Sequence, residues 1–369
     1  MKYQGIIISG TNAKTCRDIA KELETTQQYK RIRVVSSDNE KQILDYIEYD
    51  KLTEISESKF LIKQYDNNNV IAIFLQEFQE ILECNMVPII VIDQEFANMM
   101  ITELQKLGFP FLSFYINRMN ENMADAEEMC YAKNQEACIY SLNYKNLGDV
   151  VALIDKLWDL RERGGGLSRD IIELFVKSDL LIKDGKLDNV SNSSYDLTLG
   201  DEYYYAGEIR ELSDKNPFIA IEPYDYVIAS CNEKIIMPRD ISARFDVSVN
   251  LFCQGIILSN STQVDPGFRG KLFCLLFNTS NKVVYLKRQM HFTTMDFNKL
   301  IEPTTAYSGK YADENSIVPY LPTNIMQGAI NELKKEIESL KAENKTMQGI
   351  YLSAMALFLA IVSILLVLK

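Results

Sequence analysis

Residues 263–272 read Gln263-Val264-Asp265-Pro266-Gly267-Phe268-Arg269-Gly270-Lys271-Leu272. Runs of strand-forming residues stand on both sides of this stretch, at 254–258 and 272–277. Pro266 fixes φ and Gly267 accepts a positive φ, so the stretch predicts a tight turn between two strands. A carboxylate at the mouth of such a hairpin can orient a water molecule or a sugar hydroxyl. Asp265 is therefore a candidate binding or catalytic residue.

Further motifs occur in a fixed order around this turn. They are Ser168-Arg169-Asp170-Ile171, Ser194-Tyr195-Asp196-Leu197-Thr198-Leu199-Gly200, Pro238-Arg239-Asp240-Ile241, the strand-like run 286–297 and Gly309-Lys310-Tyr311. The turn itself continues into a strand that ends at Asn278. This ordered series resembles the dUTPase and dCTP deaminase superfamily, and the resemblance covers about residues 167–323.

The resemblance implies a nucleotide-binding domain. Proteins of this superfamily fold as distorted jelly-roll barrels and form trimers with a nucleotide pocket at each subunit interface. It therefore implies a homotrimer whose ligand is a pyrimidine deoxynucleotide. Short strand-like runs separated by turn signals independently favour an all-β fold. The nucleotide-binding residues carried over are Ser248, Asn250, Gly255, Asp265, Phe268, Lys310 and Tyr311.

The chain does not match the superfamily at several catalytic and phosphate-binding positions. In the deaminases, a glutamate ten positions after the turn aspartate activates the attacking water, and that position here is Leu275. Losing a general base costs about 10²–10⁴-fold in rate. The Arg-Ser-Ser phosphate motif is also altered, because the matching residues are Val247-Ser248-Val249. Deamination by the family's mechanism is therefore not expected.

Hydrolysis of dUTP is less clearly excluded. It needs an aspartate that positions water and phosphates bridged by Mg²⁺. Asp265 and Asp196 stand at suitable positions, Asp265 as the catalytic residue if the protein is hydrolytic and Asp196 as a metal ligand. The glycine-rich tail of dUTPases is absent, and Lys310-Tyr311 resembles the deaminases' phosphate clamp instead. A plain turn-capping role for Asp265 is equally compatible with the sequence.

Composition limits the possible functions. The chain has 369 residues and a formal net charge of −12, which argues against nucleic acid as a partner because phosphate neutralisation requires a basic face. Its seven cysteines include no Cys-x-x-Cys pair, which favours reduced thiols. The single histidine, His291, lies in an apolar run and is expected in the core rather than in a catalytic site.

Residues 1–163 predict an alternating α/β domain. Buried strands are expected at 5–10, 87–93 and 111–116, with helices at 16–23, 74–84 and 147–160. Alternation of this kind predicts a parallel sheet covered on both faces.

This layout resembles guanylate kinase, with a phosphate loop that has lost its chemistry. Only Gly10 precedes Lys14, the loop is two residues short, and Ala13 replaces the second glycine. Lys14 and Thr15 are either a residual phosphate loop or, as we favour, the solvated first turn of a helix. The resemblance thus implies a pseudo-kinase used for binding.

Three glycines, 164–166, mark the expected boundary with the second domain and predict a flexible joint. The β domain is expected over 164–323. A coiled-coil stalk is expected over 324–348. Its seam consists of Met326, Ile330, Leu333, Ile337, Leu340, Asn344 and Met347. Asn344 on the seam is typical of dimers, in tension with the trimeric body.

Residues 349–368 are apolar apart from Tyr351 and two serines. About 20 residues at ~1.5 Å each span a ~30 Å hydrocarbon layer, so 349–369 is expected to be a transmembrane tail anchor. Lys341 and Lys345 on its N-terminal side favour a body in the cytosol. The sequence thus predicts a membrane-anchored, catalytically degenerate deoxynucleotide sensor or effector. The alternatives are a tethered active dUTPase or dCTP deaminase, and an oligomeric scaffold that binds no nucleotide.

Overall fold

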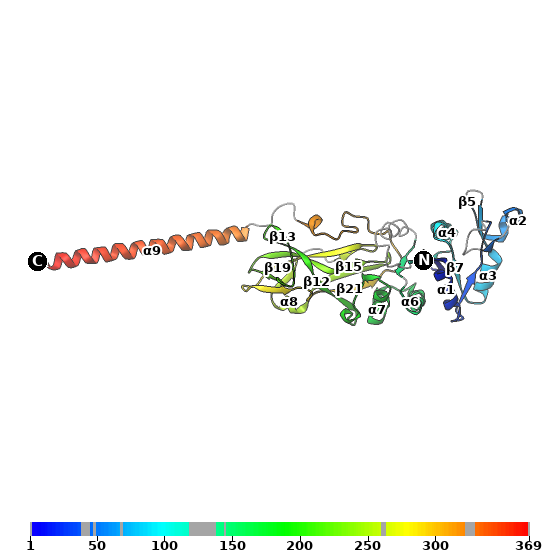
Figure 1. Ribbon diagram of the computed structural model, residues 1–369, viewed down its shortest axis with the longest axis horizontal. Helices are drawn as coiled ribbons and strands as arrows, with labels where there is room; N and C mark the ends of the chain where they lie inside the picture. Colours follow the sequence, from blue (N-terminus) through cyan, green and yellow to red (C-terminus); the bar gives the residue numbers. More distant parts are fainter. Residues whose placement is uncertain are drawn as a thin grey trace.

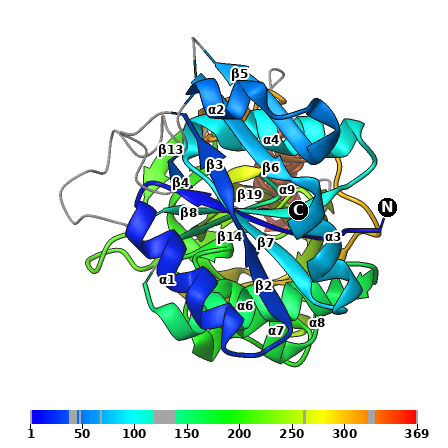
Figure 2. The ribbon, with the colours of Figure 1, turned by 90° about the vertical axis from the view of Figure 1, so that its right-hand side faces the viewer.

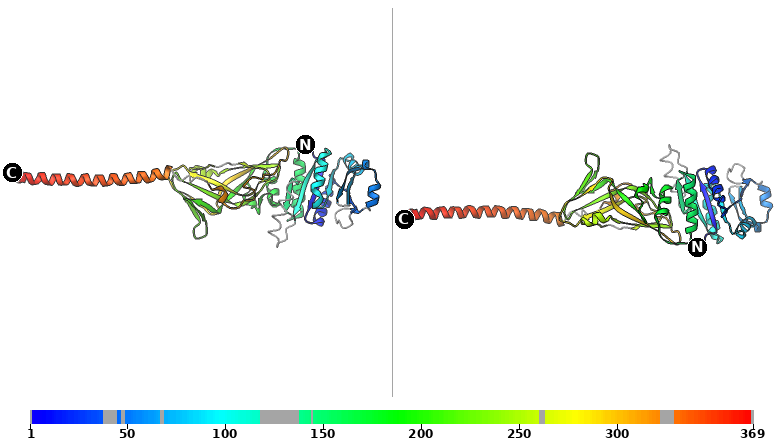
Figure 3. Two further views of the ribbon diagram at one scale, coloured as in Figure 1. Left: turned by 90° about the horizontal axis from the view of Figure 1, so that it is seen from above. Right: turned by 90° about the horizontal axis from the view of Figure 1, so that it is seen from below.

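The computed structural model shows two folded bodies placed end to end, with one long helix extending from the second body (Figures 1 and 3). The structure describes residues 2–37, 45–46, 49–66, 69–117, 138–143, 145–259, 263–321 and 329–367. The N-terminal domain lies at one end and the β domain lies between it and the helix.

A five-stranded parallel sheet forms the centre of the N-terminal domain, in the order β2-β7-β1-β8-β9. Its strands are β1 (Gly5–Gly10), β2 (Tyr29–Ile32), β7 (Val87–Val91), β8 (Phe111–Asn117) and β9 (Tyr140–Asn143). Alternate residues of β1 face opposite cores: Ile6 and Ile8 pack in one and Ile7 in the other. The predicted parallel sheet is therefore confirmed.

Helices cover both faces of this sheet (Figure 2). They are α1 (Ala13–Glu24), α3 (Leu75–Glu83), α4 (Gln94–Lys106) and α6 (Leu147–Leu160). Buried residues of α1 and α6 share the core of Ile6, whereas those of α3 and α4 share the core of Ile7. The predicted helix at 147–160 has the bounds of α6.

A second, mainly antiparallel sheet in this domain was not predicted. It has the order β4-β3-β6-β5 and carries a short helix, α2 (Tyr49–Glu54), and a 3-10 turn, η1 (Glu57–Lys59). Its strands are β3 (Val34–Ser36), β4 (Asp45–Tyr46), β5 (Phe60–Asp66) and β6 (Asn69–Phe74). Strands of two to seven residues leave a periodic signal too short to recognise.

The β domain is built on a ten-stranded sheet whose pairings are all antiparallel, which confirms the all-β prediction. The strands are β10 (Gly165–Gly166), β11 (Leu181–Lys183), β12 (Ser194–Tyr205), β13 (Glu208–Glu211), β15 (Tyr226–Ile236), β16 (Ile241–Val247), β17 (Ile256–Leu258), β18 (Gln263–Val264), β19 (Arg269–Asn278) and β21 (His291–Lys299). Strands β14 (Phe218–Ile221) and β20 (Val284–Lys287) form a separate pair, and α7 (Arg169–Lys177), α8 (Val249–Cys253), η2 (Leu187–Asn189) and η3 (Val318–Tyr320) complete the domain.

The expected flexible joint at residues 164–166 is wrong. Gly165 and Gly166 pair with Lys299 and Asn298 of β21, and the next amide, of Leu167, donates to the Phe297 carbonyl at 3.0 Å. Gly165 has φ +131°, a conformation that side chains rarely adopt. These glycines therefore form a strand pairing that requires an unusual backbone conformation.

A buried charged group joins the two domains. The Asp240 carboxylate accepts a short hydrogen bond from the Tyr140 hydroxyl of β9 and lies 3.0 Å from the Lys299 ammonium. Tyr140, Asp240 and Lys299 are all buried. Burial, followed by the neighbouring Asp240 charge, raises the pKa of Tyr140 well above its usual value. The phenol therefore stays a donor to the carboxylate.

A second junction lies at the turn between α7 and β11. The buried Asp179 accepts from Asn143 at 3.2 Å and from the Lys145 ammonium at 2.6 Å, both in the N-terminal domain. One hydrophobic cluster also includes residues of both domains. The two domains are thus held together by a common core as well as by polar contacts.

Helix α9 (Ala329–Val367) is continuous over 39 residues. Within it, Glu336–Ser363 is long and apolar enough to cross a membrane, with a mean hydropathy of 1.6 and none of its most apolar window buried. Met326 of the expected seam lies outside the described residues. The coiled coil stays a prediction, since the structure contains one chain.

Replacing Tyr140 with phenylalanine should lower the free energy of unfolding by about 1–3 kcal/mol, because a buried carboxylate loses a donor. Urea unfolding measures the change. Tyr29→Phe is the matched control: its hydroxyl donates to Asp155 at 2.8 Å within the N-terminal domain, at a less buried site. Equal destabilisation by the two variants would contradict the importance of the domain junction.

Candidate functional site

The predicted turn is present between β18 and β19. The Phe268 amide donates to the Asp265 carbonyl at 3.1 Å, and Gly267 has φ +77°. A Cβ at Gly267 would lie 2.6 Å from the Cα of Ala306, so glycine is required here by both conformation and space. The turn therefore brings Asp265 and Phe268 close to the segment that follows β21.

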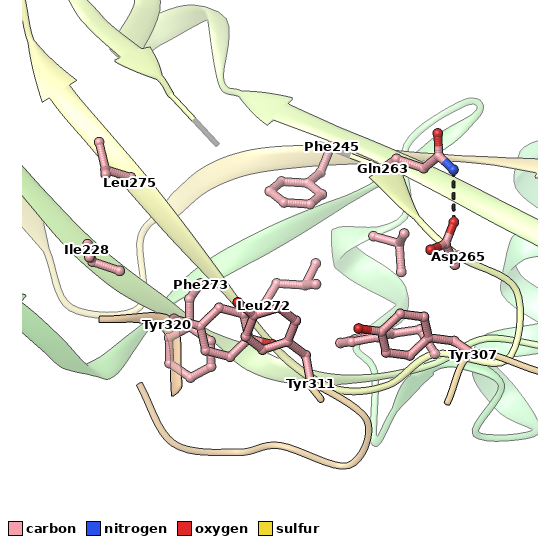
Figure 4. A pocket seen from close by; sticks show the side chains of 12 residues that line it. Ile228, Phe245, Gln263, Asp265, Leu272, Phe273, Leu275, Tyr307, Tyr311 and Tyr320 are labelled. Atoms are coloured by element: carbon pink, nitrogen blue, oxygen red, sulfur yellow. Dashed lines mark hydrogen bonds between the residues drawn. The ribbon is translucent and has the colours of Figure 1, made fainter. Parts of the chain in front are cut away.

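Beside this turn lies a cavity of about 380 Å³ (Figure 4). It is lined by Ile228, Phe245, Gln263, Val264, Asp265, Phe268, Leu272, Phe273, Leu275, Tyr307, Tyr311 and Tyr320. Three predicted site residues, Asp265, Phe268 and Tyr311, are thus brought together. Leu275, at the position of the missing base, lines the same cavity.

The segment 303–321 forms one wall of the cavity and runs beside β19. The Lys271 amide donates to the Glu314 carbonyl at 2.9 Å, and the Asp313 amide donates to the Arg269 carbonyl at 2.8 Å. Farther along, the Ile317 amide donates to the Glu202 carboxylate at 2.9 Å. We call residues 303–321 the closing segment, because these bonds hold it against the sheet.

Aromatic contacts fasten the closing segment to the cavity. Tyr320 packs on Phe273 and on Tyr311, each with ring centroids 4.4 Å apart, and Tyr307 packs on Phe268 at 5.7 Å. Burial, with smaller contributions from Tyr307 and Tyr311, raises the pKa of Tyr320 above its usual range. The Tyr320 ring is therefore neutral at ordinary pH.

The polar groups of the cavity lie together at one end. Asp265 accepts from the Gln263 side-chain amide at 2.8 Å, and Figure 4 shows this pair away from Leu275 and Ile228. Asp265 is partly buried. Its carboxylate keeps acceptor capacity for a ligand hydroxyl, since a carboxylate accepts several hydrogen bonds.

The opposite end of the cavity is apolar. Leu275 and Phe273, two residues apart on β19, both line it, together with Ile228 of β15. Asp265 is the only carboxylate among the described lining residues. A general base is consequently absent from the position where the superfamily resemblance places one.

Three predicted nucleotide contacts lie on or beside α8 and do not line the cavity. Ser248 precedes the first turn of α8, and its buried Oγ finds no hydrogen-bond partner in the described structure. Asn250 is exposed and accepts from Gln254 at 3.4 Å. Gly255, with φ +88°, lies two residues after this helix, and a Cβ there would lie 2.9 Å from the Cβ of Ser280. As nucleotide ligands these residues stay predictions.

Lys310 and Asp196 also lie outside the cavity lining. The Lys310 ammonium is 4.6 Å from the centre of the Tyr311 ring. The Asp196 carboxylate accepts from Thr294 at 2.8 Å and Ser191 at 3.4 Å. Among the described residues no group of three or more His, Cys, Asp or Glu side chains could hold a metal. Asp196 is therefore not part of such a group, and its role as a metal ligand stays a prediction.

In the degenerate phosphate loop, polar groups at the start of α1 hydrogen-bond to one another. Asn12 caps α1 and accepts from the Thr15 amide at 3.0 Å and from its hydroxyl at 3.2 Å. Lys14 is exposed. Thr15 is buried, so only Lys14 of the pair is exposed to solvent. A residual phosphate site at these residues stays a prediction.

His291 is not in the core, contrary to expectation. It is exposed at the start of β21, and its Nε2 lies 3.1 Å from the Asn189 side-chain oxygen. The β12–β21 register shifts beside it, between Leu197 and Thr198. Such a shift changes which face a strand residue occupies, and a hydropathy pattern does not reveal it.

Sequence comparison places the β domain among known proteins. A family model described as dCTP deaminase-like matches residues 167–300. The dCTP deaminase of Pyrococcus abyssi is 30% identical over 144 residues, which cover 39% of this chain and 92% of that protein. A "dCTP deaminase, dUMP-forming" from Aquifex aeolicus is 30% identical over 164 residues, covering 41% and 91%. The chain belongs to the dCTP deaminase family through this domain.

Two solved structures are similar to parts of the chain. The 2'-deoxycytidine 5'-triphosphate deaminase from Agrobacterium tumefaciens aligns with a TM-score of 0.33 at 18% identity, over 37% of this chain and 48% of that one. Guanylate kinase from Anaplasma phagocytophilum aligns with a TM-score of 0.32 at 11% identity, over 44% and 89%.

Replacing Tyr320 with alanine should loosen the closing segment. We expect amide hydrogen exchange at Lys271 and Asp313 to rise by about tenfold or more, because two aromatic contacts worth about 0.5–1.5 kcal/mol each are lost. Tyr285→Ala, at a side chain 61% exposed on β20, is the control and should change neither amide. Unchanged exchange in Tyr320→Ala would mean that the backbone bonds alone hold the segment.

Proposed function

We propose that this protein binds a pyrimidine deoxynucleotide at a membrane surface without chemically converting it. The observation that carries the proposal is Leu275, which lines the same cavity as Asp265 and Phe268 but supplies no general base. Binding needs a ring surface and a hydroxyl acceptor, and both remain. Deamination needs a proton acceptor beside the attacking water, and Leu275 supplies none at the position where the resemblance places it.

Asp265 would accept a hydrogen bond from the deoxyribose, and Phe268 would pack against the sugar. Phe268 is nearly buried and held by Tyr307, so its ring is positioned before a ligand arrives. A preorganised wall reduces the entropy lost on binding. The relatives' names support the ligand class, since they are dCTP deaminases.

We propose that the working form is a homotrimer. Apolar side chains on and beside α8 support association: Val249 is 76% exposed, Phe252 63% and Ile257 42%. An exposed group of this kind is typical of a protein interface. It lies next to Ser248, Asn250 and Gly255, so these candidate contacts would face a neighbouring copy rather than the cavity of their own chain.

A membrane anchor would place this binding site at a bilayer. The apolar part of α9 supports such an anchor. The closing segment precedes α9, and its Tyr320 contacts both the cavity and β19. A ligand in the cavity would therefore act on the wall nearest to the helix, which gives a physical route from binding to the membrane.

Full-length protein should bind dCTP or dUTP, yet release neither ammonia from dCTP nor pyrophosphate from dUTP. Asp265→Ala should weaken binding by about ten- to a hundredfold, because a charged hydrogen bond is lost. Asp246→Ala, an exposed carboxylate on β16 outside the cavity lining, is the control. Calorimetry and product assays measure both effects. Ammonia release would establish an active deaminase, and absence of binding would leave the scaffold alternative.

Deleting residues 349–369 should move the protein from the membrane fraction to the soluble fraction without changing its melting temperature. The physical reason is the loss of the apolar part of α9, which contributes nothing to the described core. Fractionation and thermal unfolding test this. A truncated protein that still sediments with membranes would place the attachment in the folded body.

A further inference from the structure

The chemistry of the cavity wall differs from that of a phosphate site. Its twelve lining residues include six aromatic rings, on Phe245, Phe268, Phe273, Tyr307, Tyr311 and Tyr320. Four more are aliphatic, and the polar groups are the three tyrosine hydroxyls and the side chains of Gln263 and Asp265. Aromatic surfaces of this extent suit a flat ring, because base stacking on aromatic side chains is independent of phosphate contacts.

Charge in the described cavity opposes a polyphosphate. No lysine or arginine is among its lining residues, whereas Asp265 contributes a negative charge. Close like charges repel, and the repulsion grows with burial. Of the nearby cations, Arg269 is buried and 3.3 Å from Asp313, and Lys310 is exposed over the Tyr311 ring.

We propose that the cavity recognises the base and deoxyribose of a pyrimidine deoxynucleoside, and that the phosphates of a nucleotide add no affinity. This inference rests on the proposed function and assigns the binding energy to the nucleoside part of the ligand. The base packs among the rings, and a sugar hydroxyl donates to Asp265. The altered residues Val247 and Leu275 fit this assignment, since neither a phosphate contact nor a general base is needed.

The test compares deoxycytidine, deoxyuridine and thymidine with their 5'-triphosphates on full-length protein in detergent, so that any residue contributed by a neighbouring copy is present. We expect the better nucleoside to bind within about threefold of its triphosphate, because a charged phosphate contact would add about ten- to a hundredfold. Affinity should also change little between about 0.05 and 0.3 M salt, since no ion pair forms.

Two failures are distinguishable in this experiment. A triphosphate that binds more than about thirtyfold tighter than its nucleoside, with strong salt dependence, would overturn the inference and leave the proposed function intact. If no nucleoside and no triphosphate produced any heat of binding, both this inference and the proposed function would be overturned.

Variants at Tyr307 test whether the ligand binds in this cavity. Tyr307→Ala should weaken nucleoside and triphosphate by the same factor, about ten- to a hundredfold, because a stacking surface is lost. Tyr307→Phe keeps the ring and should restore the affinity, which separates stacking from misfolding. A loss confined to the triphosphate in Lys310→Ala would reveal a phosphate contact and contradict the proposal.

Discussion

The architecture depends on one buried carboxylate, Asp240. An isolated charge in a protein interior is strongly unfavourable, and it becomes tolerable only when cations and donors surround it. Lys299 supplies the cation from the β domain, and Tyr140 supplies a donor from the N-terminal domain. Separating the domains would leave Asp240 without one partner and expose part of a shared core. The N-terminal domain is therefore a structural part of the body.

The candidate site combines a turn whose backbone tolerates few substitutions with a strand position that tolerates many. The turn at Asp265 is fixed by backbone demands: Gly267 has a positive φ and no room for a side chain. Leu275 stands under no such demand, because either face of a strand accepts many side chains. Either leucine or glutamate at position 275 is compatible with the fold, whereas a side chain at position 267 would displace the closing segment. The fold therefore constrains the turn at Asp265 more tightly than it constrains the residue at position 275.

Much of the fold could be predicted, because its signals are local. The buried runs of β1, β7 and β8 and the apolar face of α6 follow from side-chain periodicity, and the turn at 265–267 follows from proline and glycine geometry. The pairing of Gly165–Gly166 with β21 joins residues more than a hundred positions apart. From composition alone, those glycines were predicted to form a linker. The exposure of His291 depends on a register shift of the same non-local kind.

Part of the candidate site could also be predicted, because its motif residues are local signals in the sequence. Asp265, Phe268 and Tyr311 were found by motif, and they share one cavity. Tyr307 and Tyr320 were missed because their segment, 303–321, contains no regular element except the short 3-10 helix η3. Three tyrosines among residues 307–320 were the available signal. Ser248, Asn250 and Gly255 were carried over from the resemblance, yet they lie apart from this cavity.

The unbroken course of α9 has an electrostatic consequence. Its 20 residues from 329 to 348 precede the apolar run 349–368 and, at ~1.5 Å each, extend over about 30 Å. In the proposed membrane-anchored form, this part of the helix would separate the body from the bilayer. Fields of anionic headgroups decay over ~8 Å at physiological ionic strength. A body separated from the bilayer by that length would lie beyond the reach of anionic lipids, which would otherwise repel a chain with a net charge of −12. A ligand of the proposed site would then reach the cavity from bulk solution rather than through the layer at the membrane in which anions are depleted.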